Sequence, residues 1–274
     1  MFIPESQAGA CESTLAMKRA FLGLAIIACL AVPSVAQQIP DGTLLPVKLN
    51  NTIKAGKTRT GERVLGKLMQ PVRLPDGRNL PVGTAIMGRV LEVRPASSGS
   101  GSRVVLVFEN AQVDRRTIPI SVSLRALASM TAVFDAQLPT NLIDDYGSTV
   151  SDWNTVQVGG QAVYRGAGIV MSGPEIVGRA SDTGLVTAMP APAKGSPCSR
   201  ETAANQREQA FWVFSSNACG TYGFDDLTIE HAGRSRPIGQ IALASRGNLD
   251  VRGGSGWLLT VVAFGEMPRG PQSR

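Results

Sequence analysis

Apolar and polar side chains alternate in short runs through the first part of the chain after residue 38, and Gly, Pro and Asn/Asp turns separate these runs. A period of two is typical of strands that bury one face. The strands predicted from it span residues 44–49, 63–68, 71–74, 85–93, 103–109 and 117–124. The third run ends at Asp76-Gly77, a pair that favours a hairpin turn because both residues tolerate positive φ. Several short strands at regular spacing predict a small β-barrel or β-sandwich.

Residues 126–240 have a less regular pattern, and the sequence predicts an insertion or a second β-rich domain there. Short strands are predicted at residues 156–158, 161–164, 210–214 and 227–231. One short helix is predicted at residues 199–209, because Ser199 is a suitable N-cap and Glu201 lies in the first turn.

Apolar runs near the C-terminus complete the first domain. They predict strands at residues 239–244, 248–252 and 256–262. The predicted barrel-like domain therefore comprises residues 38–125 and 241–264, and the polar tail at 265–274 is predicted to fray. The fold class that follows is mainly β: a small β-barrel or sandwich with a β-rich insertion that carries one short helix.

The N-terminus has the three parts of a secretory signal peptide. Two basic residues precede the apolar stretch 20–32, and small side chains stand at the −3 and −1 positions of a cleavage site after Ala36. Residues 1–36 are therefore predicted to be a signal peptide, with translation starting at Met17 because the residues before it are not basic. Retention of the segment as a membrane anchor is the alternative, although the apolar stretch is short for a membrane-spanning helix.

A second processing signal overlaps the first one. Residues 26–29 read Ile-Ile-Ala-Cys and fit the pattern of a bacterial lipoprotein, in which Cys29 carries the lipid. Lipidation would hold the protein on a membrane as an outer-membrane lipoprotein, whereas cleavage after Ala36 would release it. The sequence favours cleavage after Ala36, because the apolar region before Cys29 is short. The predicted location is outside the cytoplasm, in the periplasm or the cell envelope.

Removal of the signal peptide leaves two of the four cysteines, Cys198 and Cys219. Exported proteins form disulfides readily, so the sequence predicts a disulfide between these two residues. Closing a loop of this size contributes about 3 kcal/mol in the chain-entropy description. A redox pair or a metal site is disfavoured, since the C-x-x-C spacing is missing and His231 is the single histidine. No cofactor and no metal are expected.

The net charge of +6 belongs to the mature chain, because residues 1–36 carry as many acidic as basic side chains. Most basic residues of the mature chain stand singly, and Arg115-Arg116 is their one contiguous pair. A nucleic-acid surface would need basic runs or interleaved aromatic residues, so nucleic acid is not expected as a partner. Weak attraction to anionic envelope surfaces is one interpretation of the charge. Solvated strand faces are the favoured one.

A catalytic triad could be written from His231, a serine and Asp225 or Asp226. The G-x-S-x-G elbow that would present the nucleophile is missing. A histidine at the end of a predicted strand is more often a surface residue. The sequence therefore predicts that the protein is not an enzyme.

A polar stretch contains the other candidate site residues. Asp144, Asp145 and Asp152 could form an acid pair or a weak calcium site, but their spacing matches no calcium loop and favours a solvated turn. Trp153 follows them and is the best candidate for a surface aromatic that binds a glycan or a peptide beside Asp144 and Asp145. Trp212 and Trp257 stand in apolar runs and are predicted to lie in the core.

Short motifs near both ends of the predicted barrel share a pattern in which a Pro-x-Gly-Thr turn precedes a Gly-bearing strand. They lie at residues 39–43, 46–49, 80–84, 86, 88–90, 105–108 and 253–262. Together they resemble the TrbI-like β-barrel domain of conjugation and type IV secretion channel proteins, a domain also seen in exported bacterial proteins of unknown function. The resemblance implies a barrel that the last strand closes. The Pro-rich linker, inner-membrane helix and helical antenna of the channel proteins are missing.

These features predict a non-enzymatic, exported β-barrel-like binding or scaffold protein of the bacterial cell envelope. Its expected partner is an envelope protein or polymer, and oligomers are left open. Membrane association is expected only if Cys29 is lipidated or the signal is retained. The alternatives are a periplasmic hydrolase, acting on an envelope polymer through carboxylates such as Asp144 or Asp145, and a subunit of a secretion channel.

Overall fold

The computed structural model divides the chain into two units, Met1–Val35 and Ala36–Arg274. All residues that the structure describes belong to the second unit. They are residues 38–138, 153–165, 169–172, 175–179, 185–188, 211–215, 218–230 and 238–263. Within these residues no helix is long and apolar enough to cross a membrane.

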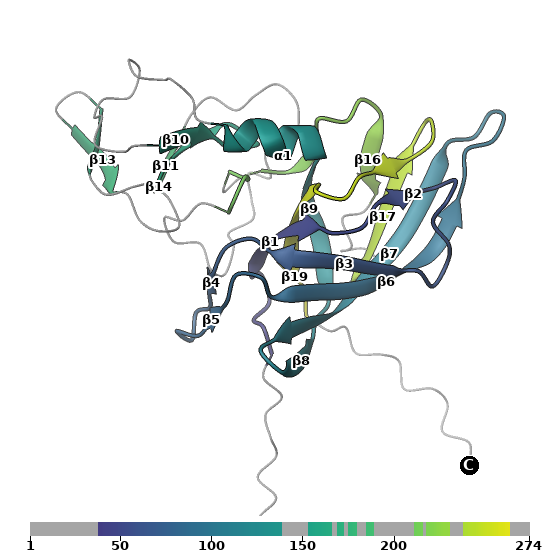
Figure 1. Ribbon diagram of the computed structural model, residues 1–274, viewed down its shortest axis with the longest axis horizontal. Coiled ribbons are helices and arrows are strands. Elements are labelled where there is room, and N and C mark those ends of the chain that lie inside the picture. The colour runs from purple at the N-terminus through teal and green to yellow at the C-terminus, as the bar shows by residue number, and fades with distance from the viewer. Residues whose placement is uncertain are drawn as a thin grey trace, which may run out of the picture. The chain divides into compact units, whose positions relative to one another are not determined.

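One large sheet dominates the described residues and curls into a nearly closed barrel (Figure 1). Its ten strands are β1 (Leu44–Leu49), β3 (Arg63–Leu68), β6 (Ala85–Arg94), β7 (Ser102–Val113), β8 (Arg116–Pro119), β9 (Val122–Ala128), β15 (Gly220–Tyr222), β16 (Leu227–Glu230), β17 (Gln240–Ser245) and β19 (Gly256–Val261). They pair in the order β15-β9-β19-β1-β3-β6-β7-β17-β16, and β8 pairs with β7. The predicted mainly β, barrel-like fold is confirmed.

The two ends of this strand order meet through a side chain. Thr221 in β15 donates a hydrogen bond from Oγ1 to the carbonyl oxygen of Leu227 in β16, at 3.0 Å. Among the described strands of the large sheet, β15 and β9 are the one parallel pair, with Gly220 opposite Ala126. β15 and β16 come from the range that the sequence analysis assigned to an insertion, yet both belong to the large sheet.

Four small sheets accompany the large one in the described residues. They are β2 (Ile53–Lys54) with β18 (Asp250–Val251), β4 (Val72–Arg73) with β5 (Asn79–Leu80), β10 (Trp153–Val156) with β11 (Gln161–Arg165) and β14 (Leu185–Ala188), and β12 (Ile169–Ser172) with β13 (Glu175–Arg179). β4 and β5 form the hairpin that Asp76-Gly77 predicted, with Gly77 at φ 85°.

Inward-facing side chains fill the barrel with one apolar core. On β1 these are Leu45, Val47 and Leu49, which are almost fully buried. Trp257 on β19 packs edge to face on Phe108 of β7, with ring centroids 5.8 Å apart and an angle of 87° between the rings. Alternation along the strands places these residues on one face, as the period of two predicts.

A second apolar cluster covers the outer face of β1, β9 and β19. Its members are Leu44, Ala126, Ala128, Val133, Ala136, Val158, Phe211, Trp212, Val213, Phe214, Ala218, Tyr222 and Leu258. Every residue of β9 and β19 is buried for this reason, since the two faces of each strand meet different apolar layers.

The helix of the described residues, α1, spans Met130–Gln137, where the sequence analysis predicted none. Ser129 caps it, because its side chain accepts a hydrogen bond from the Ala132 N–H at 3.1 Å. The pattern missed α1 because the helix is short and has no acidic residue in its first turn and no basic one in its last. The range 126–240 thus carries a short helix as predicted, at Met130–Gln137, and the predicted range 199–209 lies outside the described residues.

Two predicted strands are also corrected. The run 117–124 is divided between β8, which folds back on β7, and β9, which pairs with β19. Of the predicted run 210–214, the described residues 211–214 form a tight turn, in which the Phe214 N–H donates to the Phe211 carbonyl at 2.9 Å and Trp212 has φ 54°. Its apolar side chains lie in the second cluster, as predicted for Trp212, and its pairing is limited to isolated bridges of Phe214 with Phe211 and with Val158.

Candidate functional site

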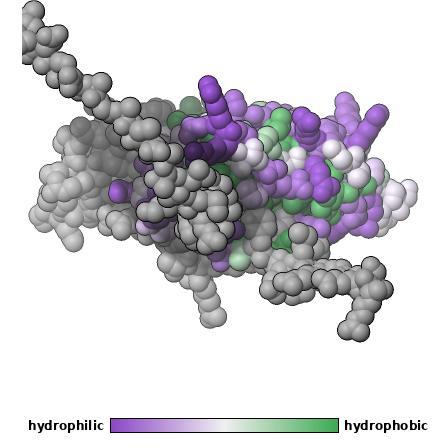
Figure 2. Space-filling view, turned by 90° about the horizontal axis from the view of Figure 1, so that it is seen from below, coloured by the Kyte–Doolittle hydropathy of each residue, from purple (hydrophilic) through white to green (hydrophobic). Residues whose placement is uncertain are grey.

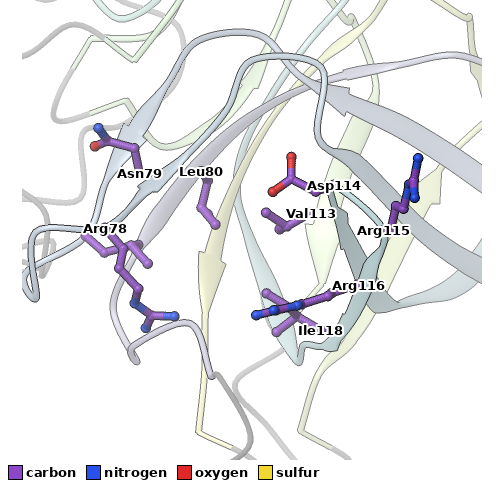
Figure 3. Close-up of a pocket in the computed structure, with 9 residues that line it drawn as sticks. Arg78, Asn79, Leu80, Val113, Asp114, Arg115, Arg116 and Ile118 are labelled. Atoms are coloured by element: carbon purple, nitrogen blue, oxygen red, sulfur yellow. The ribbon is translucent and has the colours of Figure 1, made fainter. Parts of the chain in front are cut away.

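A cleft of about 580 Å³ lies between the β4–β5 hairpin and the β7–β8 hairpin (Figure 3). We call it the arginine cleft. Its lining residues are Leu74, Arg78, Asn79, Leu80, Val113, Asp114, Arg115, Arg116 and Ile118. Figure 3 shows Arg78 and Arg116 extending toward one another from opposite hairpins.

The β4–β5 hairpin holds Arg78 in place. Its backbone N–H donates to Asp76 Oδ1 at 3.0 Å and its Nε to Asp76 Oδ2 at 2.6 Å. A further donor, Nη2, reaches the carbonyl oxygen of Gln38 at 3.0 Å. These hydrogen bonds from Arg78 hold the pKa of Asp76 below its usual value, although desolvation acts weakly in the opposite direction. The guanidinium is therefore oriented before any ligand arrives.

The opposite wall comes from the tight turn between β7 and β8. Val113 pairs with Arg116, so Asp114 and Arg115 form the tip of the hairpin. Asp114 has φ 53°, in the left-handed region that aspartate tolerates better than most residues. This turn brings the contiguous arginine pair of the sequence to one rim of the cleft.

The arginine cleft has an excess of positive charge. Three guanidinium groups line it, against one lining carboxylate, that of Asp114, and the carboxylate of Asp76 that pairs with Arg78. Leu74, Leu80 and Ile118 are almost fully buried and form an apolar floor. A guanidinium offers a planar fork of donors that matches a carboxylate or a phosphate. The arrangement is therefore suited to binding an anionic group.

A second cleft, of about 560 Å³, lies near the ends of β16 and β17 and contains Asp225 and Asp226. Asp226 Oδ2 accepts hydrogen bonds from Ser245 Oγ at 2.8 Å and from the Gly247 N–H at 2.9 Å. These two bonds lower the pKa of Asp226. Asp226 therefore fixes the turn after β17, and this arrangement describes a structural carboxylate.

The lowered pKa of Asp226 predicts that part of the free energy of unfolding depends on pH in the acidic range. Its folded-state pKa is depressed, so its contribution is full above the unfolded pKa of about 4 and is lost as the pH falls through the folded value. Asp226→Asn is expected to lower the free energy of unfolding at pH 7 by at most about 1 kcal/mol, because solvent screens this surface group. Urea unfolding at pH 7 and pH 3 measures the effect.

The difference between Asp226→Asn and the wild type should shrink at pH 3. Asp225→Asn is the matched control, because the neighbouring Asp225 is exposed. A difference that stays constant between the two pH values would show that the charge of Asp226 contributes nothing.

Most site residues singled out in the sequence lie outside the described residues: Cys29, Asp144, Asp145, Asp152, Cys198 and His231. Trp153 begins β10, where it pairs with Arg165. Cys219 lies beside the second cluster, and its N–H donates to Tyr222 Oη at 3.0 Å. Burial raises the pKa of the Tyr222 phenol. The pairing of Cys219 with Cys198 stays a prediction.

The arginine cleft was not anticipated as a site. Two signals for it stand in the sequence, the contiguous pair Arg115-Arg116 and the turn at Asp76-Gly77. Neither signal shows that the two hairpins lie next to each other, because this depends on the pairing order of the large sheet.

Within the described ranges no three His, Cys, Asp or Glu side chains come together to hold a metal ion.

In comparisons with known proteins, no protein-family model matches the chain, and neither does any curated protein or solved structure.

Proposed function

We propose that the protein is an exported, non-enzymatic binding or scaffold module of the bacterial cell envelope that holds an acidic group of its partner in the arginine cleft. The observation that carries this proposal is that Arg78 and Arg116 extend toward one another across a cleft that Arg115 also lines. Asp114 is the one carboxylate of the lining, and Asp76 pairs with Arg78 beside it. Export is supported by the signal-peptide pattern of residues 1–36.

The cleft is built for binding with little reorganisation. Arg78 is held by Asp76 and by the Gln38 carbonyl, and the arginine pair stands on a two-residue turn. Groups that are already oriented lose less conformational entropy when a ligand binds. A carboxylate-bearing envelope protein or an acidic polymer has the chemistry that this cleft recognises.

Two further parts of the proposal come from the sequence. We propose that Cys198 and Cys219 form a disulfide in the oxidising envelope. We also propose a TrbI-like barrel domain, on the short motifs at residues 80–84 and 88–90 and on the barrel-like sheet.

Binding of a fluorescein-labelled hexaglutamate peptide tests the proposal. Fluorescence anisotropy at low salt is expected to show that Arg115→Gln/Arg116→Gln raises the Kd at least about tenfold, since two charge-assisted hydrogen bonds are lost. The matched control is Lys57→Gln/Arg59→Gln, which removes the same charge from an exposed loop outside the cleft.

The control variant is expected to change the Kd less than threefold. An equal loss in the two variants would mean that the peptide responds only to net charge, and the arginine cleft would no longer be the binding site. Circular dichroism spectra of the two variants should match the wild type, because the exposed side chains they replace lie outside the core.

A further inference from the structure

Three strands of the barrel present basic side chains on their outer face. On β3, Val64 and Leu68 point into the core, so Arg63, Leu65 and Lys67 point outward and are exposed. We call the outer surface formed by Lys48, Arg63, Leu65, Lys67, Met87 and Arg89 the basic face. Figure 2 shows that hydrophilic side chains dominate the described surface in that view, with smaller apolar areas between them.

The strand register places like charges opposite each other on the basic face. Lys48 of β1 is the partner of Lys67 on β3, and Arg63 of β3 is the partner of Arg89 on β6. Residues directly opposite in an antiparallel pair have Cβ atoms about 5 Å apart, and like charges at this distance destabilise the sheet. The sheet therefore contains two pairs of like-charged residues whose repulsion would be absent with neutral side chains.

Counter-charges are sparse on this face. Arg89 forms an ion pair with Glu109, with Nη2 and Oε1 3.1 Å apart. Among the described residues, no carboxylate oxygen lies within 4.0 Å of the charged groups of Lys48, Arg63 or Lys67.

The same barrel compensates another arginine fully. Arg103 on β7 donates from Nε to Glu230 Oε2 at 2.8 Å and from Nη1 to Glu92 Oε2 at 3.0 Å. The hydrogen bond to Glu230 is the main reason why the pKa of Arg103 is raised. In comparison with Arg103, the basic side chains of the basic face have few carboxylate partners.

An apolar pair lies between the two basic pairs. Leu65 is 37% exposed, and its cross-strand partner is Met87. None of the three described clefts is lined by a residue of the basic face. The basic face therefore has a small apolar centre with long basic side chains around it. It matches the chemistry of an anionic bilayer, where basic side chains extend to phosphates and apolar groups enter the interface.

We propose that the basic face docks on the surface of an anionic phospholipid bilayer. Lipid phosphates supply the counter-charge that Lys48, Arg63 and Lys67 lack and relieve the repulsion across the strands. This association needs neither a lipid on Cys29 nor a retained signal segment. It differs in that respect from the membrane association expected from the sequence.

Co-sedimentation of the full chain with vesicles tests the proposal. Two kinds of vesicle are compared. One contains phosphatidylcholine with about 30% phosphatidylglycerol, which is anionic, and the other contains phosphatidylcholine alone. Lys48→Gln/Arg63→Gln/Lys67→Gln is expected to lower partitioning onto the anionic vesicles at least about tenfold, since each basic residue near such a surface contributes a factor of about five. Partitioning of the wild type should fall as salt is added.

The matched control is Lys57→Gln/Arg59→Gln/Arg252→Gln, which removes three exposed charges away from the basic face. It is expected to keep partitioning within about threefold of the wild type. An equal loss in the control, or equal binding of the wild type to vesicles without phosphatidylglycerol, would overturn the proposal. Because the N-terminal segment is the same in all of these proteins, it does not affect the comparison.

Two further measurements separate a bilayer from other partners. Leu65→Ser leaves the charge unchanged and is expected to lower partitioning about threefold or more, because an apolar group leaves the interface; a variant that binds like the wild type contradicts the docking mode. The triple variant of the basic face should unfold at the same temperature as the wild type or higher, since repulsion is removed. If that variant loses hexaglutamate binding but keeps vesicle binding, the face binds an acidic protein instead, and the proposal fails.

Discussion

Gly88→Ala is expected to lower the free energy of unfolding by about 3 kcal/mol or more, a large share of the roughly 5–15 kcal/mol that is ordinary for a folded domain. A Cβ atom at this position would overlap the carbonyl oxygen of Val107 and would lie 2.8 Å from Phe108 Cα. Both neighbours are backbone atoms of β7, which pairs with β6 along most of its length. No side-chain rotation can remove this clash.

The close approach at Gly88 coincides with an irregularity of the sheet. The register between β6 and β7 shifts between Met87 and Gly88, where Gly88 lies opposite Phe108. Glycine at such a position lets a barrel strand bend sharply toward its neighbour. Phe108, the residue opposite Gly88, is fully buried in the core of the barrel.

Urea unfolding followed by circular dichroism measures the effect, and Gly56→Ala is the matched control. A Cβ atom at Gly56 would have no heavy atom within 4 Å. The control is expected to change stability by less than about 1 kcal/mol, in either direction. If Gly88→Ala is as stable as Gly56→Ala, then β6 and β7 do not approach each other as closely as the structure has them.

The barrel strands with one solvated face were the predictable part of the fold. Strands β1 and β3 begin and end at the predicted residues. In β3 the inward apolar positions alternate with exposed outward ones, whereas the outward Leu44 of β1 is buried in the second cluster. The hairpin at Asp76-Gly77 was predictable as well, since the turn needs positive φ at Gly77.

The local sequence pattern did not predict the correct secondary structure where apolar residues are buried on the outside of the barrel instead of in its core. The apolar residues 211–214 form a turn that covers the outside of the barrel, and they pair only through isolated bridges. α1 covers the same outer face with Val133 and Ala136, and its sequence carries few helix signals apart from the Ser129 cap. Burial of an apolar run does not distinguish a strand from a turn.

The candidate sites depend on long-range pairing that the sequence does not display. Arg78 and Arg116 stand on different hairpins, and Lys48 meets Lys67 only in the register of β1 and β3. A single basic residue in an alternating run is typical of a solvated strand face, which is how the sequence analysis interpreted them. The register of the strands places basic residues that are isolated in the sequence directly opposite each other in the sheet.

Trp257→Ala is expected to lower the free energy of unfolding by about 3–5 kcal/mol. Trp257 is fully buried, and it lies on β19 between Val47 of β1 and Leu127 of β9. Its ring meets Phe108 edge to face, a geometry that adds to the area buried. Alanine would leave a cavity in the middle of the barrel, where paired strands on both sides prevent collapse.

Trp257→Phe separates the volume of the ring from its N–H group. Trp257 Nε1 is buried and has no hydrogen-bond partner among the described residues, and an unsatisfied buried donor costs about 1–3 kcal/mol. Phenylalanine removes this donor and keeps most of the apolar contact. Trp257→Phe is therefore expected to lose less than half as much stability as Trp257→Ala in urea unfolding monitored by circular dichroism. Equal losses in the two variants would show that the indole N–H has a partner in solution, such as a bound water, and that the polar end of this side chain stabilises the barrel.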